Sequence, residues 1–371
     1  MRRGRFQATF HVRSRPEDID TRARTIAIEQ SVEMPLSAID DAAILRDVAG
    51  TVEGVEDLGD GRFEVRIDLA VATVGDDAGQ LLNMAFGNTS LHEDVVLRDI
   101  VLSPELEAAF GGPRHGLAGL RQRVGAADRA LTCSALKPQG LTPNRLAELA
   151  ERFARGRLDF IKDDHGIANQ AYSRFADRVP AIAAAVRRAA QTTGHPTRYV
   201  PSLSGDLEQV QRQIRLACNE GVDTVLISPM ISGVAALQAL VRDWPDVAFF
   251  AHPTMGGAAR ICPELLIGKL FRLFGADAVI FPNFGGRFGY SPETCRRLAE
   301  NARAPNPRLR ASVPVVAGGM TTERVPEILG FYGTDAMLLL GGSLLQTRQQ
   351  LTEATLAFAA SVARYQGGVM Q

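Results

Sequence analysis

Lysine is almost missing from this chain. Lys and Arg together number 41, yet only Lys137, Lys162 and Lys269 are lysine. Arginine stays protonated at any working pH, whereas an amine can lose its proton, act as an acid or base, or add a carbonyl compound or CO2. Lys137 and Lys162 stand where predicted strands end, so we interpret both as candidates for chemistry. The alternative is that both remain by chance in an arginine-rich chain.

A large excess of either charge is lacking too. The formal net charge is -1, whereas nucleic-acid-binding domains usually carry a basic excess. The basic start MRRGR precedes FQATFHV rather than a long apolar run, which does not fit a signal peptide. No stretch approaches the ~20 apolar residues of a membrane span. The four cysteines lack CxxC spacing, as expected for free thiols in a reducing compartment. We expect a cytoplasmic protein with no nucleic-acid or membrane partner.

The pattern of apolar runs divides the chain in two. Residues 1–125 alternate extended runs at 6–12, 21–30 and 62–73 with a helical stretch near 74–86, and are predicted to form an α+β domain. The Gly- and Arg-rich segment 110–125 is predicted to connect it to residues 126–371. There, eight apolar runs are each followed by a helical stretch. They lie at 130–137, 158–164, 197–204, 223–230, 247–253, 277–283, 312–319 and 336–342.

Eight strands that are nearly continuous in apolar residues indicate a parallel sheet buried on both faces. Such a sheet closes into a (β/α)8 TIM barrel, with its chemistry at the C-terminal strand ends, or stays open and doubly wound. Polar and glycine-rich groups recur at the strand ends and not at the starts, which favours the barrel. The predicted fold is α/β, with a C-terminal TIM barrel and an N-terminal α+β, ferredoxin-like domain.

In a barrel the strand ends converge on one cavity. The groups found there are Lys137, Lys162, Asp164, His165, Ser204, Ser228, His252, Asn283, Gly318, Gly319, Gly341 and Gly342. Asp164 offers an oxygen ligand, His165 a nitrogen ligand, and Lys162 an oxygen ligand if CO2 carbamylates its amine. Three ligands with open positions suit Mg2+ or a similar ion that binds an enediolate. A solvated charged turn is the alternative.

Paired glycines end the last two predicted strands. Barrels bind phosphate at this place through backbone N–H groups and a short helix N-terminus. Gly318, Gly319, Gly341 and Gly342 are therefore predicted to bind a phosphate, although glycines that only make turns are the alternative.

Several motifs resemble one family. GRLDFIKDDHGIANQAYSRFADRV resembles the segment of ribulose bisphosphate carboxylase large subunits that carries the carbamylated lysine. SALKPQGL, AHPTM, NFGGRFG, VAGGM and LLLGGS stand in that family's order and spacing. IAIEQS and AFGNTSL resemble the glutamate and asparagine motifs that complete a neighbouring subunit's site. The chain is identified as a RuBisCO-like protein.

The resemblance implies a head-to-tail homodimer with shared sites. By this likeness Lys162 is the carbamylated metal ligand and Asp164 the second ligand, while His165 stands where the carboxylase has glutamate. Lys137 matches a proton-transfer lysine, and Gln139 replaces the lysine that follows it.

Further residues carry over from the family. Glu29 and Asn88 match the residues that a neighbouring subunit donates. His252 matches the histidine after strand five and is expected to relay protons or bind a hydroxyl. Arg287 lies near the family's mobile-loop lysine.

The departures from the carboxylase concern its second phosphate. Pro253, and Phe281 or Pro282, stand where the family has an arginine and a histidine for that phosphate. The side chains of these residues cannot donate hydrogen bonds, and burying a dianion without donors is prohibitive. We expect one phosphate at the glycines and an apolar group at the other end. With Gln139 and Arg287 in place of lysines, CO2 fixation is not expected.

The apolar end resembles the branch that isomerises 5-methylthioribulose 1-phosphate in methylthioadenosine salvage. This implies Mg2+-assisted enolisation of a sugar phosphate ketone, with the Lys162 carbamate or Lys137 as base. Two other enzymes stay open: an enolase of 2,3-diketo-5-methylthiopentyl 1-phosphate, and a decarboxylase or hydrolase of a branched 3-oxo sugar-acid phosphate. A regulatory pseudoenzyme that binds a sugar phosphate is the non-enzyme alternative.

Overall fold

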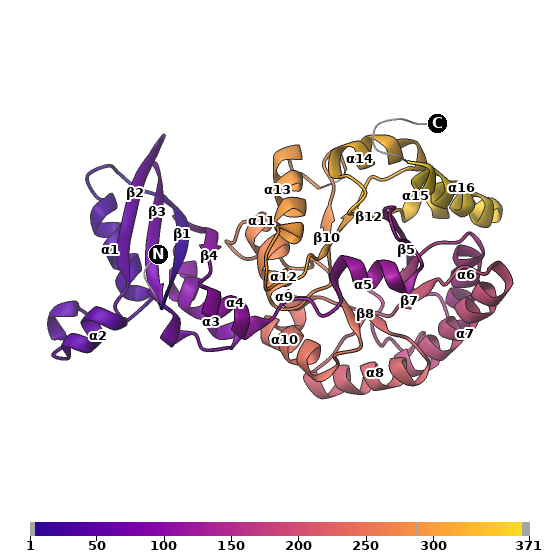
Figure 1. Ribbon diagram of the computed structural model, residues 1–371, viewed down its shortest axis with the longest axis horizontal. Coiled ribbons are helices and arrows are strands. Elements are labelled where there is room, and N and C mark those ends of the chain that lie inside the picture. Colours follow the sequence, from indigo (N-terminus) through magenta and orange to yellow (C-terminus); the bar gives the residue numbers. More distant parts are fainter. Residues whose placement is uncertain (1–3, 287, 366–371) are drawn as a thin grey trace. The chain divides into compact units, whose positions relative to one another are not determined.

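The computed structural model describes residues 4–286 and 288–365 (Figure 1). These residues form two compact units. The first runs to Gly112 and includes Met255–Leu266, and the second comprises Pro113–Thr254 and resumes at Ile267. The division therefore falls within the predicted connection. Among the described helices, none combines the length and the apolar character that a membrane span needs.

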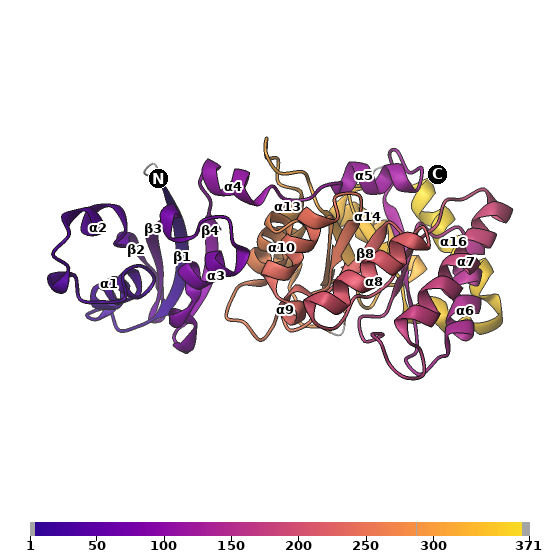
Figure 2. The ribbon, with the colours of Figure 1, turned by 90° about the horizontal axis from the view of Figure 1, so that it is seen from below.

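The first unit contains a four-stranded antiparallel sheet in the order β2-β3-β1-β4. Its elements are β1 (Arg5–Arg13), α1 (Ile19–Glu29), α2 (Ala42–Asp47), β2 (Thr51–Gly59), β3 (Arg62–Ala70), α3 (Ala78–Phe86), β4 (Val95–Val101), α4 (Pro104–Phe110) and α11 (Pro263–Leu265). Along β3, Val65, Ile67 and Leu69 are buried and alternate with polar residues, as expected for a sheet with one covered face. Helix α1 packs against β2 and β3 (Figure 2).

One sequence prediction in this unit is wrong. Residues 21–30, predicted as an extended run, lie mostly in helix α1. The buried residues of this helix are Ile19, Ala23, Ile26 and Ala27. Their spacing of three and four residues places them on one helical face, and this periodicity outweighs the β-branched content of the segment.

Strands β2 and β4 were not among the predicted extended runs. Most of β2 is exposed or half-buried, so its apolar alternation is weak. One edge of β4 pairs with β1, and the other edge forms a β-bridge between Leu97 and Ile261. In this bridge, Leu97 N donates to Arg260 O, and Cys262 N donates to Leu97 O. The segment Met255–Leu266 thus covers an edge that would otherwise present unpaired backbone groups.

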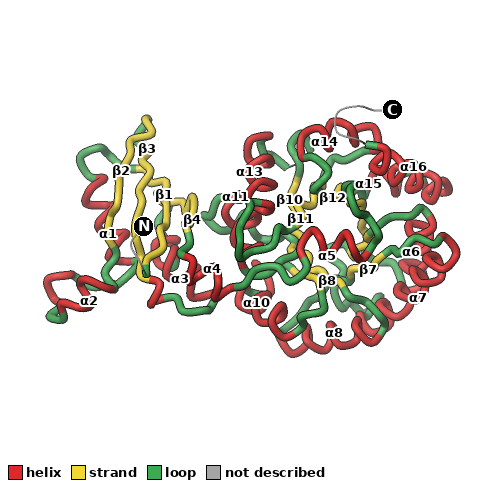
Figure 3. The backbone as a smooth tube through the Cα atoms, in the orientation of Figure 1, coloured by secondary structure: helices red, strands yellow, loops and turns green. Residues whose placement is uncertain are grey.

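The second unit contains eight parallel strands surrounded by helices (Figure 3). Its elements are α5 (Gly116–Arg123), β5 (Leu131–Leu136), α6 (Pro143–Arg155), β6 (Phe160–Asp163), α7 (Phe175–Thr193), β7 (Arg198–Val200), α8 (Leu207–Asn219), β8 (Thr224–Ile227), α9 (Pro229–Ser232), α10 (Val234–Asp243), β9 (Ala248–Ala251), α12 (Phe271–Leu273), β10 (Ala278–Pro282), α13 (Pro292–Arg303), β11 (Val313–Ala317), α14 (Val325–Tyr332), β12 (Met337–Leu339), α15 (Gly342–Leu345) and α16 (Leu351–Arg364). All eight predicted strands are present.

The sheet closes on itself between β7 and β8. Its strand order is β7-β6-β5-β12-β11-β10-β9-β8. The segment after β7 completes the ring, because Leu203 N donates to Leu226 O and Leu226 N donates to Pro201 O. The barrel prediction is confirmed, and the open doubly wound alternative is excluded.

Strand alternation decides which residues face the barrel interior. Leu131 and Cys133 of β5 and Phe160 of β6 belong to the interior core, and α5 adds Leu120 at the N-terminal end. Continuing each alternation toward the C-terminal ends places Lys137, Lys162, Asp164 and His252 on the same interior face. The strand pattern therefore brings the predicted catalytic residues to one mouth.

Candidate functional site

Three polar side chains meet where β5 and β6 end. Nζ of Lys137 lies 2.8 Å from Oδ1 of Asp164, and Nδ1 of His165 lies 3.4 Å from the same oxygen. Burial would raise the pKa of Asp164, but the hydrogen bonds from His165 and Lys137 outweigh it and hold that pKa well below its usual range. Asp164 is therefore a carboxylate at neutral pH, with both contacts on one oxygen.

Lys162 lies beside this group and is only 2% exposed. Its Nζ donates to the backbone O of Asp163 over 2.8 Å. Burial lowers the pKa of the amine below its usual value, although the Asp164 carboxylate opposes the shift. A lower pKa enlarges the neutral fraction of the amine, which is the nucleophilic form that adds CO2.

His252 stacks on His165, with ring centroids 4.3 Å apart and an interplanar angle of 11°. The backbone N–H of Thr254 donates to Nδ1 of His252 over 3.3 Å, which assigns the ring proton to Nε2. Burial, and next the charge of Lys162, lower the pKa of His252 to about 2. His252 is therefore neutral at working pH and offers an N–H donor.

Gly318 and Gly319 follow β11, and Gly341 and Gly342 come just after β12. Gly319 has a φ of +64°, and a Cβ there would stand 2.8 Å from Cα of Gly286, so a side chain would displace the loop after β10. A Cβ on Gly341 would stand 4.0 Å from Cε of Lys137, and one on Gly342 would meet nothing within 4 Å. The end of β12 thus adjoins Lys137 and leaves space at Gly342.

Backbone donors are available at both glycine pairs. Within residues 4–286 and 288–365, the N–H groups of Gly318, Gly319, Gly341 and Gly342 donate no hydrogen bond. Ser343 Oγ donates to Met320 O over 2.8 Å and so links the two loops. Free N–H groups at a strand end and at the start of α15 are the donors that a phosphate needs.

Two residues at the end of β10 face the helices instead of the interior. Asn283 is fully buried and accepts a hydrogen bond from the Tyr332 hydroxyl of α14 over 2.7 Å. Phe281 packs against the same ring, with centroids 6.1 Å apart. Because Ile280 faces the interior core, residues 281 and 283 must face outward. The prediction that Asn283 opens onto the cavity is wrong, and the apolar end cannot include Phe281; Pro282 takes the inward position.

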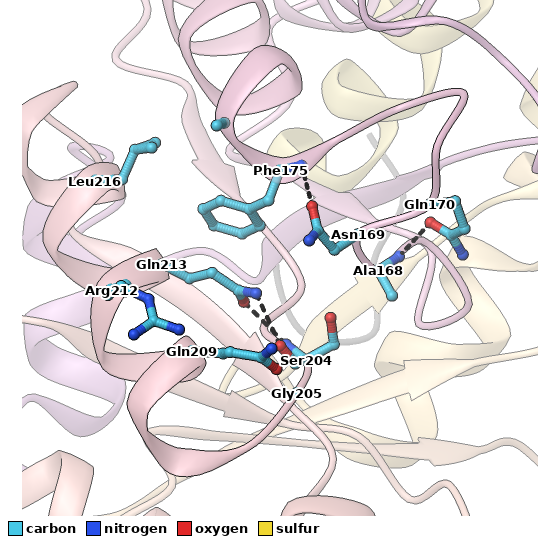
Figure 4. A pocket seen from close by; sticks show the side chains of 11 residues that line it. Ala168, Asn169, Gln170, Phe175, Ser204, Gly205, Gln209, Arg212, Gln213 and Leu216 are labelled. Carbon is cyan, nitrogen blue, oxygen red and sulfur yellow. Dashed lines mark hydrogen bonds between the residues drawn. The ribbon is translucent and has the colours of Figure 1, made fainter.

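A cavity of about 550 Å³ opens between the loops after β6 and β7 (Figure 4). Residues Ala168–Gln170 line one side, and Ser204, Gln209 and Gln213 line another. Gln213 holds both backbone groups of Ser204, over 3.0 Å and 2.8 Å. Gln213 thus holds the loop at Ser204 in place. None of the predicted catalytic residues lines this cavity.

The first unit gathers a second polar cluster. Asn88 Nδ2 donates to Glu29 Oε1 over 2.9 Å and to Glu33 Oε1 over 2.8 Å. The structure therefore joins the two residues predicted to serve a neighbouring subunit, and it adds Glu33, which sequence reasoning missed. Arg287, the remaining predicted residue, lies outside the described residues.

A metal ion at this site would need a ligand from Lys162. Among the described residues, no three His, Cys, Asp or Glu side chains are grouped to hold a metal. Asp164 and His165 provide one oxygen and one nitrogen donor, and a carbamate on Lys162 would provide the third. The buried amine with its lowered pKa suits carbamate formation. The donor set therefore fits a divalent cation that accepts oxygen and imidazole ligands.

Comparison with known proteins decides the family. Residues 116–349 match the model of the ribulose bisphosphate carboxylase large chain, catalytic domain. The chain belongs to this family. Within it, the crystal structure of a Rubisco-like protein from Rhodopseudomonas palustris superimposes with a TM-score of 0.92 at 49% identity, covering 98% of this chain and 99% of the other.

Two curated members of the RuBisCO family bear on chemistry. The 5-methylthioribulose-1-phosphate isomerase of Rhodospirillum rubrum is 59% identical over 97% of this chain and 96% of its own length. The 2,3-diketo-5-methylthiopentyl-1-phosphate enolase of Geobacillus thermodenitrificans is 31% identical over 88% of this chain and 84% of its own length. The predicted RuBisCO-like family is confirmed.

Proposed function

We propose that the protein isomerises 5-methylthioribulose 1-phosphate in methionine salvage. The observation that carries the proposal is 59% identity to an isomerase of that name over nearly the full length of both chains. The reaction moves a proton: a base removes it from the carbon beside the ketone, and an acid returns it to another carbon.

The chemistry centres on Lys162 and its neighbours. The neutral amine of Lys162 bonds to the carbon of CO2 and releases one proton, which leaves a carbamate. Mg2+ held by this carbamate, Asp164 and His165 would polarise the substrate ketone. Support comes from the burial of Lys162, its lowered pKa and the single-oxygen contacts of Asp164.

Lys137 and His252 serve the proton transfers. With Lys162 carbamylated, Lys137 is the remaining amine at the mouth and carries the proton between carbons. His252, whose Nδ1 accepts from the Thr254 N–H, donates from Nε2 to a substrate oxygen.

Substrate orientation follows from the two ends of the site. The four glycines bind the phosphate through N–H groups that are free among the described residues. The methylthio group lies at the opposite end, beside Pro282 and Pro253, which offer no side-chain donor.

A homodimer completes the site. Glu29 and Asn88 of one subunit serve the site of the other. Helix α2 buries none of its residues, and Met34, Leu36, Ile44 and Leu45 are 38–40% exposed. An apolar segment without a covering partner supports an interface.

Turnover in D2O tests the function. With 5-methylthioribulose 1-phosphate as substrate, we expect NMR spectra to show conversion to an isomeric monophosphate. Conversion of the diketo phosphate instead would favour the enolase, and release of CO2 from a 3-oxo sugar-acid phosphate the decarboxylase. Binding without turnover or proton exchange would show a pseudoenzyme.

A further inference from the structure

Asp163 stands between two residues of the proposed metal site, yet its side chain points the other way. Lys162 and Asp164 face the barrel interior, so alternation directs Asp163 toward the helices. There it is fully buried, as is its partner Arg178 on α7. Apolar residues normally fill this layer between a barrel and its helices.

Three donors from separate segments converge on the Asp163 carboxylate. Arg178 Nε and the backbone N of Ser202 each donate to Oδ2 over 3.1 Å. The Tyr199 hydroxyl donates to Oδ1 over 2.8 Å. Ser202 lies in the segment that closes the barrel beside β8, and Tyr199 lies on β7.

Arg178 extends this network to the loop that follows β6. Its Nη1 donates to Ser173 O over 2.8 Å, and its guanidinium lies 5.4 Å from the centre of the Phe175 ring. One carboxylate thus ties the end of β6 to β7, to the closing segment, to α7 and to its own loop.

The same residue holds Lys162 directly. The backbone oxygen of Asp163 accepts the hydrogen bond from Nζ of Lys162. When the Asp163 side chain is fixed, its peptide is fixed as well, and with it the acceptor of the amine and the direction of Asp164. A buried ion pair is weak evidence for stability, because an apolar pair of similar size is often as stable. Its place here calls for another role.

We propose that Asp163, held by Arg178, Tyr199 and Ser202, is a positioning residue that sets the orientation of Lys162 and Asp164 for metal binding and catalysis. This inference rests on the proposed function. Residues that orient metal ligands from behind typically change metal affinity or activity by about 10–100-fold when replaced.

The test compares two buried aspartates at opposite ends of one strand. Asp159, just before β6, is also fully buried and accepts hydrogen bonds from Arg129, over 2.6 Å to each oxygen. Asp163→Asn and Asp159→Asn each remove one buried charge. The temperature of thermal unfolding should fall in both variants. In bicarbonate buffer, Mn2+ titration followed by the signal of free Mn2+ should show affinity reduced about tenfold or more in Asp163→Asn only.

Kinetics give the second measurement. Asp163→Asn should lower kcat by about tenfold or more with KM nearly unchanged, while Asp159→Asn keeps both. Mn2+ affinity and kcat of a folded Asp163→Asn that match those of Asp159→Asn would overturn the proposal.

If Asp163→Asn does not fold, Tyr199→Phe decides, since it removes one hydrogen bond and keeps the ring. A loss of about threefold in Mn2+ affinity supports the proposal, and wild-type affinity and kcat overturn it. A wild type without isomerase activity refutes the proposed function, and the Mn2+ affinities of the variants still test the positioning role. If the wild type binds no Mn2+, the proposed metal site is refuted. The comparison of kcat and KM between Asp163→Asn and Asp159→Asn then still tests the positioning role.

Discussion

At the N-terminal end of the barrel strands, Asp277 precedes β10 and accepts hydrogen bonds from the backbone N–H groups of His115, Gly116 and Phe249. At the C-terminal end, Asp164 follows β6, and its contacts with Lys137 and His165 both reach one oxygen. Burial raises the pKa of Asp277 despite its three donors, whereas hydrogen bonds lower the pKa of Asp164 against its burial. One carboxylate is bound by backbone donors, and the other leaves its second oxygen outside both of these contacts.

Lys162→Ala should give the largest effect on function. Turnover should fall about a thousandfold, because the carbamate and one metal ligand disappear together. Unfolding temperature should change little. Lys269→Ala, in the helical segment Leu266–Leu270, is the matched control and should keep full turnover. Near-normal activity of Lys162→Ala would show that catalysis does not depend on the residues at the C-terminal end of the barrel.

Asp277→Ala should give the converse result. Three N–H groups, two of them buried, lose their acceptor, and each buried group left without one costs about 1–3 kcal/mol. The free energy of unfolding in guanidinium should drop by about 3–5 kcal/mol. At a temperature where the variant stays folded, kcat should equal that of the wild type. A fall in kcat would show that the N-terminal end of the barrel also contributes to catalysis.

Gly342→Val tests the phosphate end of the mouth. No atom lies within 4 Å of a Cβ at Gly342, so stability should be unchanged. The side chain would occupy the space of the phosphate oxygens, and substrate binding should weaken by about 2–3 kcal/mol, the scale of one or two charge-assisted hydrogen bonds. Calorimetry with the phosphorylated and unphosphorylated sugar separates the effects. Equal weakening of both would contradict a phosphate site.

The smallest effect concerns pH. The pKa of His252 is about 2 in the folded chain, against 6.5 for an ordinary histidine. As pH falls below 6.5, the unfolded chain gains a proton that the folded chain does not, so stability is lost with falling pH. Between pH 7 and 5, the wild type should lose roughly 1–2 kcal/mol more than His252→Gln in urea unfolding.

The barrel was predictable because its strands are short, nearly continuous apolar runs that end in polar or glycine residues. Alternation then carries Lys137, Lys162 and Asp164 to the mouth without any knowledge of contacts. Asn283 and Phe281 were misplaced because the inward register of β10 depends on tertiary packing with Tyr332, and a strand end alone does not give that register.

Other features depend on partners that are distant in sequence. The role of Asp163 becomes visible only when Arg178, Tyr199 and Ser202 are brought to it. Residues 21–30 show a different limit, because two periodicities compete in one short segment and β-branched content favoured the wrong one.

The segment Met255–Leu266 has a consequence for synthesis of the chain. It lies between β9 and β10 in sequence, yet it pairs with β4 of the first unit through Leu97. A ribosome adds about 5–20 residues per second, and domains usually fold as they emerge. Here the first unit cannot finish its sheet edge until five strands of the barrel have already been made. A nascent chain truncated before Met255 should therefore expose β4 to chaperones or to other copies.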